Sequence, residues 1–180
     1  MELSMTKFSK AGFSLVELLV AVAVTALLLA ATFGVLATSI LSFQNTADQG
    51  ANVQISREAL NRISNEIRNA TAIQSPAFTS GTATAGTILN YTSPDIASPN
   101  RRIAMGSGTD VNNILIINRD NNAVIQRIGQ GRVQAGSLNF SRSGADQRVF
   151  TVSLIFQSNA FGGSVNTPVS TVVTTLNSGT

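Results

Sequence analysis

The 180-residue chain contains no cysteine, no histidine and no tryptophan. Without cysteine no disulfide can form, so the fold must be held by packing alone. Without histidine and cysteine the common nucleophile–base pairs are missing, and a structural zinc site lacks its usual ligands. The carboxylates are spread singly along the chain and do not suggest an acid–base pair. The composition therefore predicts a protein that is not an enzyme and that requires no cofactor.

Lysine is also scarce, because Lys7 and Lys10 are the only two in the chain. Both precede the longest apolar segment. Basic residues before an apolar segment favour a cytoplasmic N-terminus. The pair is therefore interpreted as the basic part of a leader.

The apolar segment covers residues 13–41, and its only charged side chain is Glu17. As a helix it would span ~43 Å at ~1.5 Å per residue, more than the ~30 Å of a hydrocarbon core. It is too long for the apolar core of an ordinary signal peptide, and the small residue Gly12 precedes it instead of following it. We expect a membrane-spanning helix. A simple signal anchor is the alternative, but it leaves Gly12 and Glu17 unexplained.

A carboxylate inside an apolar helix needs compensation. On insertion scales it costs ~2.5–3.5 kcal/mol at the centre of a membrane helix, so such residues usually have a function. Glu17 lies about one helical turn from the start of the segment. The sequence therefore predicts a partner that neutralises Glu17.

The residues Lys10-Ala11-Gly12-Phe13-Ser14-Leu15-Val16-Glu17 resemble the N-terminal signal of type IV pilins and type II secretion pseudopilins. This resemblance implies that a prepilin peptidase cuts between Gly12 and Phe13 and methylates Phe13. Residues 1–12 would then be a leader. The implied partners are the peptidase, other pilin or pseudopilin subunits and an inner-membrane assembly platform. The implied location is the bacterial inner membrane, followed by a surface filament or a periplasmic pseudopilus.

The same resemblance implies a role for Glu17 in assembly. In that family the carboxylate of an incoming subunit pairs with the N-terminal amine of a neighbouring one, which selects the register of the filament. The alternative is an ion pair between Glu17 and the amine of its own chain. Both pairings can occur, at different stages.

Beyond the membrane segment, residues 42–73 are expected to continue the helix, to about Ala72. An apolar stripe with helical spacing faces the domain. Polar residues occupy the other face, where Glu58, Arg62 and Glu66 follow at intervals of four and support an exposed surface. The stripe consists of Val53, Leu60, Ile63, Ile67 and Ala70.

Residues 74–180 are expected to form a globular antiparallel β domain. Residues 75–109 predict a long variable loop with one short strand near Thr87–Tyr91. A hairpin is predicted for Asn113–Ile117 and Ala123–Ile128. A long helix followed by antiparallel strands gives an α+β fold with the helix laid on one sheet, the layout of pilins. The remaining strands are predicted at Ser137–Arg142, Arg148–Gln157 and Val169–Leu176.

Two polar loops, residues 110–113 and 118–122, offer oxygen ligands for calcium. Neither has the spacing of a twelve-residue calcium loop, and Asn and Asp are common in turns. The turn interpretation is favoured, so no metal site is predicted. Without its first twelve residues the chain keeps ten arginines and eight carboxylates. The arginines are scattered, so the charge does not by itself predict a nucleic-acid partner.

The segment Glu66-Ile67-Arg68-Asn69-Ala70, the hairpin and the last strand resemble the W-type minor subunits of pili and the J-type subunits of secretion systems. Minor subunits tend to initiate assembly at the tip, so we favour a minor pilin of a type IV pilus-like filament. A pseudopilin of a type II secretion system and a membrane-anchored surface domain are the alternatives. Adhesion, motility and DNA uptake are not distinguished.

Overall fold

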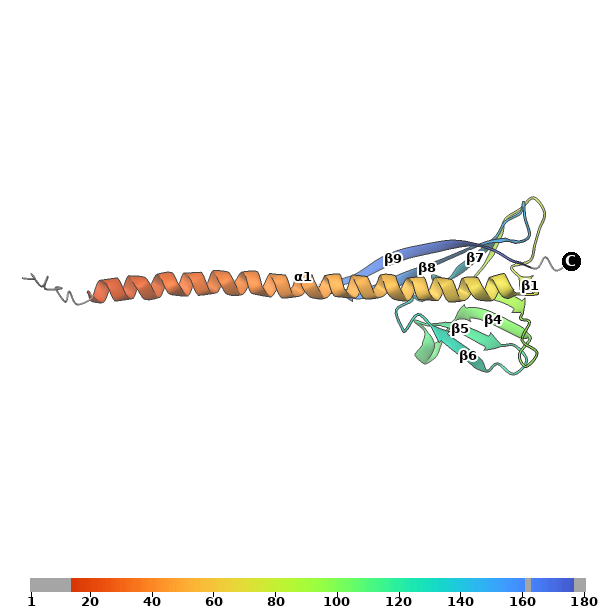
Figure 1. Ribbon diagram of the computed structural model, residues 1–180, viewed down its shortest axis with the longest axis horizontal. Helices are drawn as coiled ribbons and strands as arrows, with labels where there is room; N and C mark the ends of the chain where they lie inside the picture. The colour runs from red at the N-terminus through yellow and green to blue at the C-terminus, as the bar shows by residue number, and fades with distance from the viewer. Residues whose placement is uncertain (1–13, 161–162, 177–180) are drawn as a thin grey trace, which may run out of the picture. The chain divides into compact units, whose positions relative to one another are not determined.

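A computed structural model describes residues 14–160 and 163–176 of the chain. The chain divides into two compact units, Met1–Phe43 and Gln44–Thr180. Helix α1 (Leu15–Asn69) contributes its first half to one unit and its second half to the other. The colour scale of Figure 1 follows it from red to yellow.

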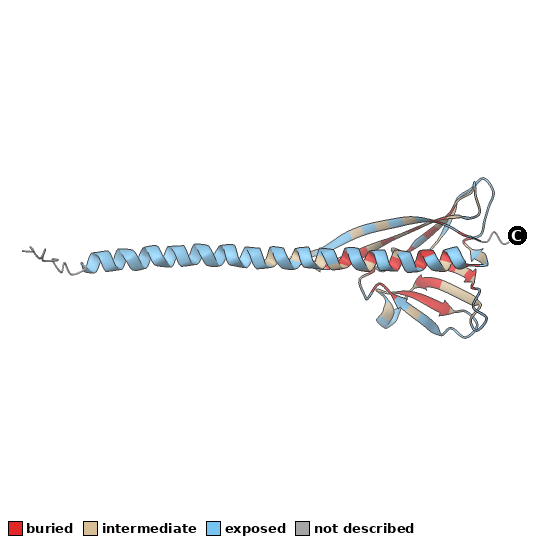
Figure 2. Cartoon of the chain, viewed as in Figure 1, coloured by how far each residue is buried: buried red, intermediate tan, exposed pale blue. Residues whose placement is uncertain are grey.

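The described part of the first unit is helix from Leu15 onward, and its apolar side chains are exposed as far as Ile40 (Figure 2). Alanine and leucine are strong helix formers and no proline interrupts them. The hydroxyl groups in this segment bond to carbonyls one turn earlier, as Thr25 does to Ala21 over 2.7 Å and Ser39 to Val35 over 2.8 Å. These internal bonds satisfy polar groups without water. The segment is long and apolar enough to cross a membrane.

The helix ends earlier than predicted. Its last residue is Asn69, and Ala72 already belongs to strand β1 (Ala72–Ser75). Thr71 donates its backbone N–H to the carbonyl of Thr92 over 2.9 Å, which turns the chain into the sheet. The predicted end was three residues late because Ala70 and Ala72 favour a helix by propensity, whereas the pairing of Ala72 with Thr92 in the sheet decides the end.

Two antiparallel sheets, not one, pack with α1 in the second unit. Their strand orders are β1-β3-β4-β5-β6 and β2-β7-β8-β9. In Figure 1, β4–β6 lie below the C-terminal part of α1, and β7–β9 lie above it. The α+β class is confirmed. The other strands are β2 (Thr84–Gly86), β3 (Leu89–Thr92), β4 (Asn100–Met105), β5 (Ile114–Asn118), β6 (Val124–Ile128), β7 (Asn139–Arg142), β8 (Val149–Ala160) and β9 (Gly163–Thr174).

The segment predicted as a variable loop contains three strands, β2, β3 and β4, and the short 3₁₀ helix η1 (Gly108–Asp110). The strand expected near Thr87–Tyr91 corresponds to β3. The other two were missed because β2 is only Thr-Ala-Gly and β4 begins with Asn-Arg-Arg. Neither sequence shows the alternation that marks a strand.

The later strands match the predictions more closely. The predicted hairpin is β5 and β6, and Asn122 in its turn has φ of 56°, which asparagine tolerates. Strand β9 is longer than predicted, since it starts at Gly163 and pairs with β8 along all twelve residues. The sequence did not predict this extension because Asn166 and Pro168 are residue types that are uncommon in strands.

The core lies where one face of α1 meets the inner faces of both sheets (Figure 2). Ile63 and Ile67 are fully buried on the helix, as predicted. Val53 was predicted in this stripe but is 42% exposed. The buried face of the helix contains small and polar residues beside the isoleucines, and the small residues allow close packing on the sheets. Its members are Asn52, Ser56, Ala59, Ile63, Ser64 and Ile67.

Candidate functional site

Two hydrogen bonds cap the N-terminus of α1, and Ser14 donates one of them and accepts the other. The backbone N–H of Ser14 donates to Glu17 Oε2 over 3.2 Å, and Ser14 Oγ accepts the N–H of Val16 over 3.3 Å. This arrangement is a capping box, which satisfies backbone donors that a helix start leaves without partners. It gives Glu17 a structural role that the charge argument overlooked, although the Ser-x-x-Glu spacing was visible in the sequence.

The other predicted site residues, Lys7, Lys10, Gly12 and Phe13, lie outside the described residues. The proposed cleavage and methylation positions therefore remain expectations. Glu17 is exposed at the start of the apolar helix. Between residues 14 and 47 it is the only charged side chain.

The capping box fixes where this charge is held. Because Glu17 accepts the amide hydrogen of Ser14, its carboxylate is held against the backbone at the first described residue of the chain. A negative group at a helix N-terminus also interacts favourably with the helix dipole.

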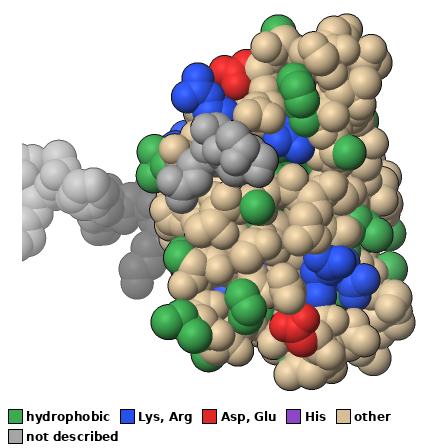
Figure 3. All heavy atoms as spheres, turned by 90° about the vertical axis from the view of Figure 1, so that its right-hand side faces the viewer, with side chains coloured by type: hydrophobic (Ala, Val, Ile, Leu, Met, Phe, Trp, Pro, Cys, Tyr) green, Lys and Arg blue, Asp and Glu red, His purple; other side chains and the backbone are tan. Residues whose placement is uncertain are grey.

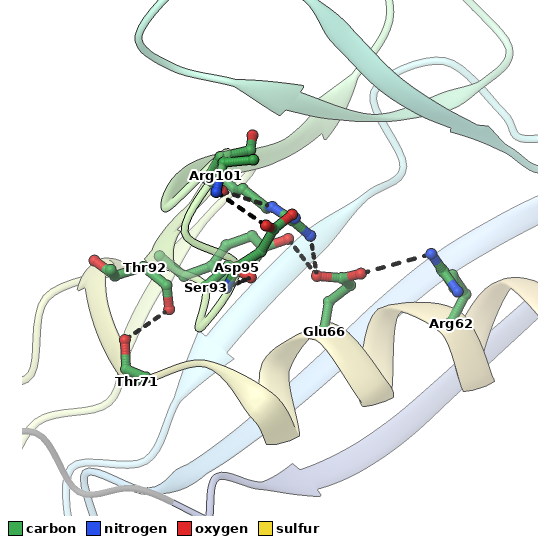
Figure 4. A network of polar contacts seen from close by, with 10 residues as sticks. Arg62, Glu66, Thr71, Thr92, Ser93, Asp95 and Arg101 are labelled. Atoms are coloured by element: carbon green, nitrogen blue, oxygen red, sulfur yellow. Dashed lines mark hydrogen bonds and ion pairs between the residues drawn. The ribbon is translucent and has the colours of Figure 1, made fainter.

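A second polar group joins the far end of α1 to the sheet β1-β3-β4-β5-β6 (Figure 4). Glu66 accepts the Tyr91 hydroxyl hydrogen over 2.8 Å and lies 3.4 Å from Arg101 Nη1. Arg101 also pairs with Asp95, in the loop between β3 and β4. Burial, together with the Glu66 carboxylate, raises the pKa of Tyr91 far above its ordinary value, so the phenol stays neutral and donates.

Glu66 was predicted on the exposed face of the helix, and this placement is wrong. Its side chain is only 15% exposed, because β3 and β4 cover it. Arg62 remains on the surface and lies 3.8 Å from Glu66, which agrees with the predicted spacing of four. No ion pair joins Glu58 to Arg62 among the residues that the structure describes. The group anchors the helix and does not form an open site.

Arg142 is a buried cation that sequence reasoning missed. Its Nε donates to the carbonyl of Gln147 over 2.8 Å, and its Nη1 donates to the carbonyl of Pro76 over 3.2 Å. The guanidinium also stacks on the rings of Phe78 and Phe150. Burial lowers the pKa of Arg142. These contacts fix the loop that precedes β2, and no sequence signal separated this arginine from the exposed ones.

The two loops considered for calcium form turn contacts. Asn118 Oδ1 accepts the N–H of Asp120, and Asn121 Oδ1 accepts the N–H of Ala123, both over 2.9 Å. Asp110 Oδ1 accepts Arg127 Nε over 2.9 Å, and this hydrogen bond lowers the pKa of Asp110. Within residues 14–160 and 163–176, no three acidic or metal-binding side chains gather as a metal site would require.

The charged side chains do not form a basic stripe on the face drawn in Figure 3. Arginine side chains occur there in small separate groups, surrounded mostly by uncharged side chains. A nucleic-acid footprint would be a continuous basic patch. This face therefore gives no support for nucleic-acid binding.

Comparison with known proteins adds one finding. Residues 7–33 match the family model of the prokaryotic N-terminal methylation motif, a range that includes Gly12, Phe13 and Glu17. No curated protein and no solved structure matches the chain. The long helix on antiparallel sheets is consistent with the pilin fold. The motif and the apolar helix together support a type IV pilin-like or pseudopilin subunit, a structural protein anchored in the membrane as a precursor.

Proposed function

We propose that the chain is a minor subunit of a type IV pilus-like filament, cleaved after Gly12, methylated at Phe13 and assembled through α1. The observation that carries this proposal is Glu17 at the start of the exposed apolar helix, within the matched methylation motif. The capping box needs only an acceptor, which glutamine also supplies, so a simple anchor has no need for a negative charge there. A subunit that must dock at one fixed position along its neighbours in the filament does need a charge there.

Charge pairing gives the assembly step its chemistry. After cleavage the amine of Phe13 is a cation at the boundary of an apolar helix. Two opposite charges attract several times more strongly in a low dielectric than in water. Glu17 of an incoming subunit meets the amine of a neighbour, while the apolar faces of α1 leave lipid and pack in the filament core. The second unit is presented outside.

The partners in this scheme are a prepilin peptidase, other pilin subunits and an assembly platform in the bacterial inner membrane. The minor role rests on the resemblance of residues 66–70, of the predicted hairpin and of the last strand to W-type and J-type subunits. A subunit that initiates assembly should be rare in the filament and needed for its formation.

The test is to delete the gene and to count sheared surface filaments, then to detect this chain in filaments from the wild type. The proposal expects filament loss on deletion and a low ratio of this chain to the main subunit. Filaments that form normally without the chain would contradict the proposal. An equal ratio would contradict the minor role alone.

A further inference from the structure

Strand β9 leaves one backbone edge without a neighbouring strand, because it is the last strand of its sheet and pairs only with β8 (Figure 1). The other outer strands of the two described sheets are β1, β2 and β6. An open edge presents unpaired N–H and C=O groups that can bond another strand. The protection of each edge therefore indicates where a further strand can add.

The edges of β1, β2 and β6 carry the features that natural proteins use against such pairing. Strand β1 has four residues and a bulge at Gln74, and β2 has only three residues. Strand β6 has five residues, a bulge at Ile125 and the charged Arg127. Short length, bulges and charge all hinder the addition of a strand. These three edges are therefore poor places for a partner.

Strand β9 differs from them in every one of these features. It has twelve residues, its pairing with β8 contains no bulge, and its sequence contains no charged residue. Pro168 removes one donor, and proline is the only protective feature within the strand. Among the described strands, β9 is thus the one whose edge can pair with an extended segment over several residues.

The hydrogen bonds of β8 identify the groups of β9 that face outward. The N–H of Ile155 donates to Ser137 Oγ over 3.1 Å, and its carbonyl accepts the N–H of Gln134 over 2.8 Å. Both groups of Ile155 point away from β9, so in an antiparallel pair those of the opposite residue, Pro168, point away from β8. The alternation continues along the strand. After Pro168 the outward-facing residues are Ser170, Val172 and Thr174.

A second set of bonds agrees with this assignment. The N–H of Ser143 donates to the carbonyl of Val149 over 2.9 Å, so Val149 also points away from β9. Its partner in β9, Thr174, therefore faces the free edge. The N–H of Thr175 then donates to the carbonyl of Arg148 over 3.0 Å, as the alternation requires. The outward direction of residues 170–174 thus rests on bonds at both ends of the segment.

These outward groups determine the chemistry of the partner. They repeat every second residue, at ~6.8 Å for a strand that rises ~3.4 Å per residue. An extended polypeptide supplies donors and acceptors with the same repeat. The side chains of Ser170, Val172 and Thr174 are exposed and uncharged, and Val172 is 64% exposed. No charge in β9 would compensate a charged side chain beside it, so an uncharged segment fits this edge.

We propose that the free edge of β9 binds an extended, uncharged segment of a different subunit, which adds to the sheet β2-β7-β8-β9 beside residues 170–174. The inference rests on the proposed function, because a minor subunit is rare in the filament and its neighbours are other chains. One such contact for each copy of this chain agrees with a low ratio to the main subunit. Main-chain hydrogen bonds supply the affinity, as in other cases of strand addition.

Photo-cross-linking in intact cells tests this contact. The full chain carries a photoreactive benzophenone amino acid at position 172, together with either Ser170→Pro or Ser170→Ala. Proline removes the outward N–H of residue 170, as Pro168 does two residues earlier, whereas alanine keeps it. We expect a product with a different chain from the Ser170→Ala protein. At equal membrane levels, the Ser170→Pro protein should give at least tenfold less of it.

Mass spectrometry of the product identifies the partner and the cross-linked segment. The proposal requires an uncharged segment of a chain that is also present in purified filaments. Equal yields from Ser170→Pro and Ser170→Ala would overturn the edge pairing. A product made of two copies of this chain, or of this chain and a protein absent from filaments, would also overturn it.

Thermal unfolding of the detergent-purified variants checks that the fold is intact. Ser170→Pro and Ser170→Ala should melt at the same temperature, because the N–H of residue 170 is not bonded to β8. If Ser170→Pro is destabilised, Thr174→Pro is compared with Thr174→Ala, since Thr174 also faces outward. A product that is equally abundant in this second pair would reject the proposal.

The outcomes separate this inference from the proposed function. Filaments that contain this chain but give no proline-sensitive product leave the proposed function standing and reject the edge pairing. A proline-sensitive product in cells whose filaments form normally after deletion of this chain supports the edge pairing and rejects the proposed function. Absence of both the product and the filament defect rejects both.

Discussion

The hydroxyl of Tyr91 donates a hydrogen bond of 2.8 Å to Glu66 Oε2, and this bond joins strand β3 to the last turns of α1. Arg101 approaches the same carboxylate oxygen from β4. The helix is thus attached to the sheet by a neutral donor and a cation that share one acceptor. The contact explains why a charged helix residue is covered.

Replacing Tyr91 by Phe should destabilise the protein by about 1.5–3 kcal/mol, the range for a hydrogen bond to a charged group. The lower end is expected because Arg101 still satisfies Glu66. Thermal unfolding of the detergent-purified chain measures the change. Ile96→Ala, at a side chain that is 95% exposed, is the matched control and should have no effect. A Tyr91→Phe protein as stable as wild type would show that the hydroxyl contributes nothing.

The fragment Gln44–Thr180 should fold without the apolar half of α1. It contains the buried face of the helix and both sheets. We expect a soluble protein whose circular dichroism shows helix and strand together. A fully helical or unfolded spectrum would contradict the independence of this unit.

Replacing Gly12 by Val should block cleavage of the precursor. A branched side chain at this position would crowd the active site of the peptidase. Intact mass of the membrane-purified protein should show loss of residues 1–12 and one added methyl group for wild type, and the full precursor for the variant. A wild-type chain that keeps Met1 would contradict the proposed cleavage site.

Glu17→Val should leave membrane insertion and cleavage intact but prevent entry into filaments. Removing one partner of a buried ion pair costs ~3–5 kcal/mol, which lowers a docking constant by roughly a hundredfold or more. Sheared filaments are quantified at equal levels of mature membrane protein.

Glu17→Gln separates the two roles of this side chain. Glutamine keeps an oxygen that can accept the Ser14 N–H but removes the charge. If charge pairing selects the subunit, Glu17→Gln should fail as Glu17→Val does. Normal assembly of Glu17→Gln would assign the effect to the capping box and would reject the charge pairing.

Stability should change little between about pH 5 and 8, because the chain has no histidine, whose ordinary pKa lies in that range. Hydrogen bonds from Arg127 lower the pKa of Asp110, and those from Arg148 lower the pKa of Asp146. A carboxylate with a depressed pKa stabilises the fold above its ordinary value of 3.8, and the contribution disappears as the pH falls through the lower folded value.

The melting temperature should therefore decline below about pH 4. Arg127→Gln, which removes the partner of Asp110, should flatten part of this decline. Arg57→Gln, at an exposed position of α1, is the control and should leave the acid profile unchanged. An Arg127→Gln profile that matches wild type would contradict the contribution of Asp110.

Sequence reasoning succeeded where periodicity was strong. Residues 13–41 predicted a membrane-spanning helix because no charge other than Glu17 interrupts them, and the described part of this segment is a helix long and apolar enough to cross a membrane. The β5–β6 hairpin was evident because two apolar runs flank a turn rich in Asn and Asp. These signals are local, so one sequence is enough to read them.

Sequence reasoning failed where burial and strand pairing depend on contacts between distant parts of the chain. Nothing local distinguishes Glu66, which two strands cover, from Glu58, which stays exposed. The division of the strands into two sheets was missed because pairing partners are far apart in the sequence, as Thr84 and Arg142 are. Val53 was predicted in the core because it is hydrophobic. In the structure the sheets pack against the neighbouring face of the helix, so Asn52 and Ser56 are buried and Val53 is exposed.

The bond from the Leu176 N–H to the Arg68 carbonyl, 3.1 Å long, links the last described strand to the last turn of the helix. It joins positions roughly a hundred residues apart, and closing a chain segment of that length costs about 4 kcal/mol of entropy. The contact can form only after the chain has been synthesised as far as Leu176. During synthesis the apolar helix is therefore complete and available to the membrane long before β9 exists. The second unit therefore completes this contact only after the apolar helix has been made, and a chain that ends before Leu176 lacks the bond that ties the end of β9 to α1.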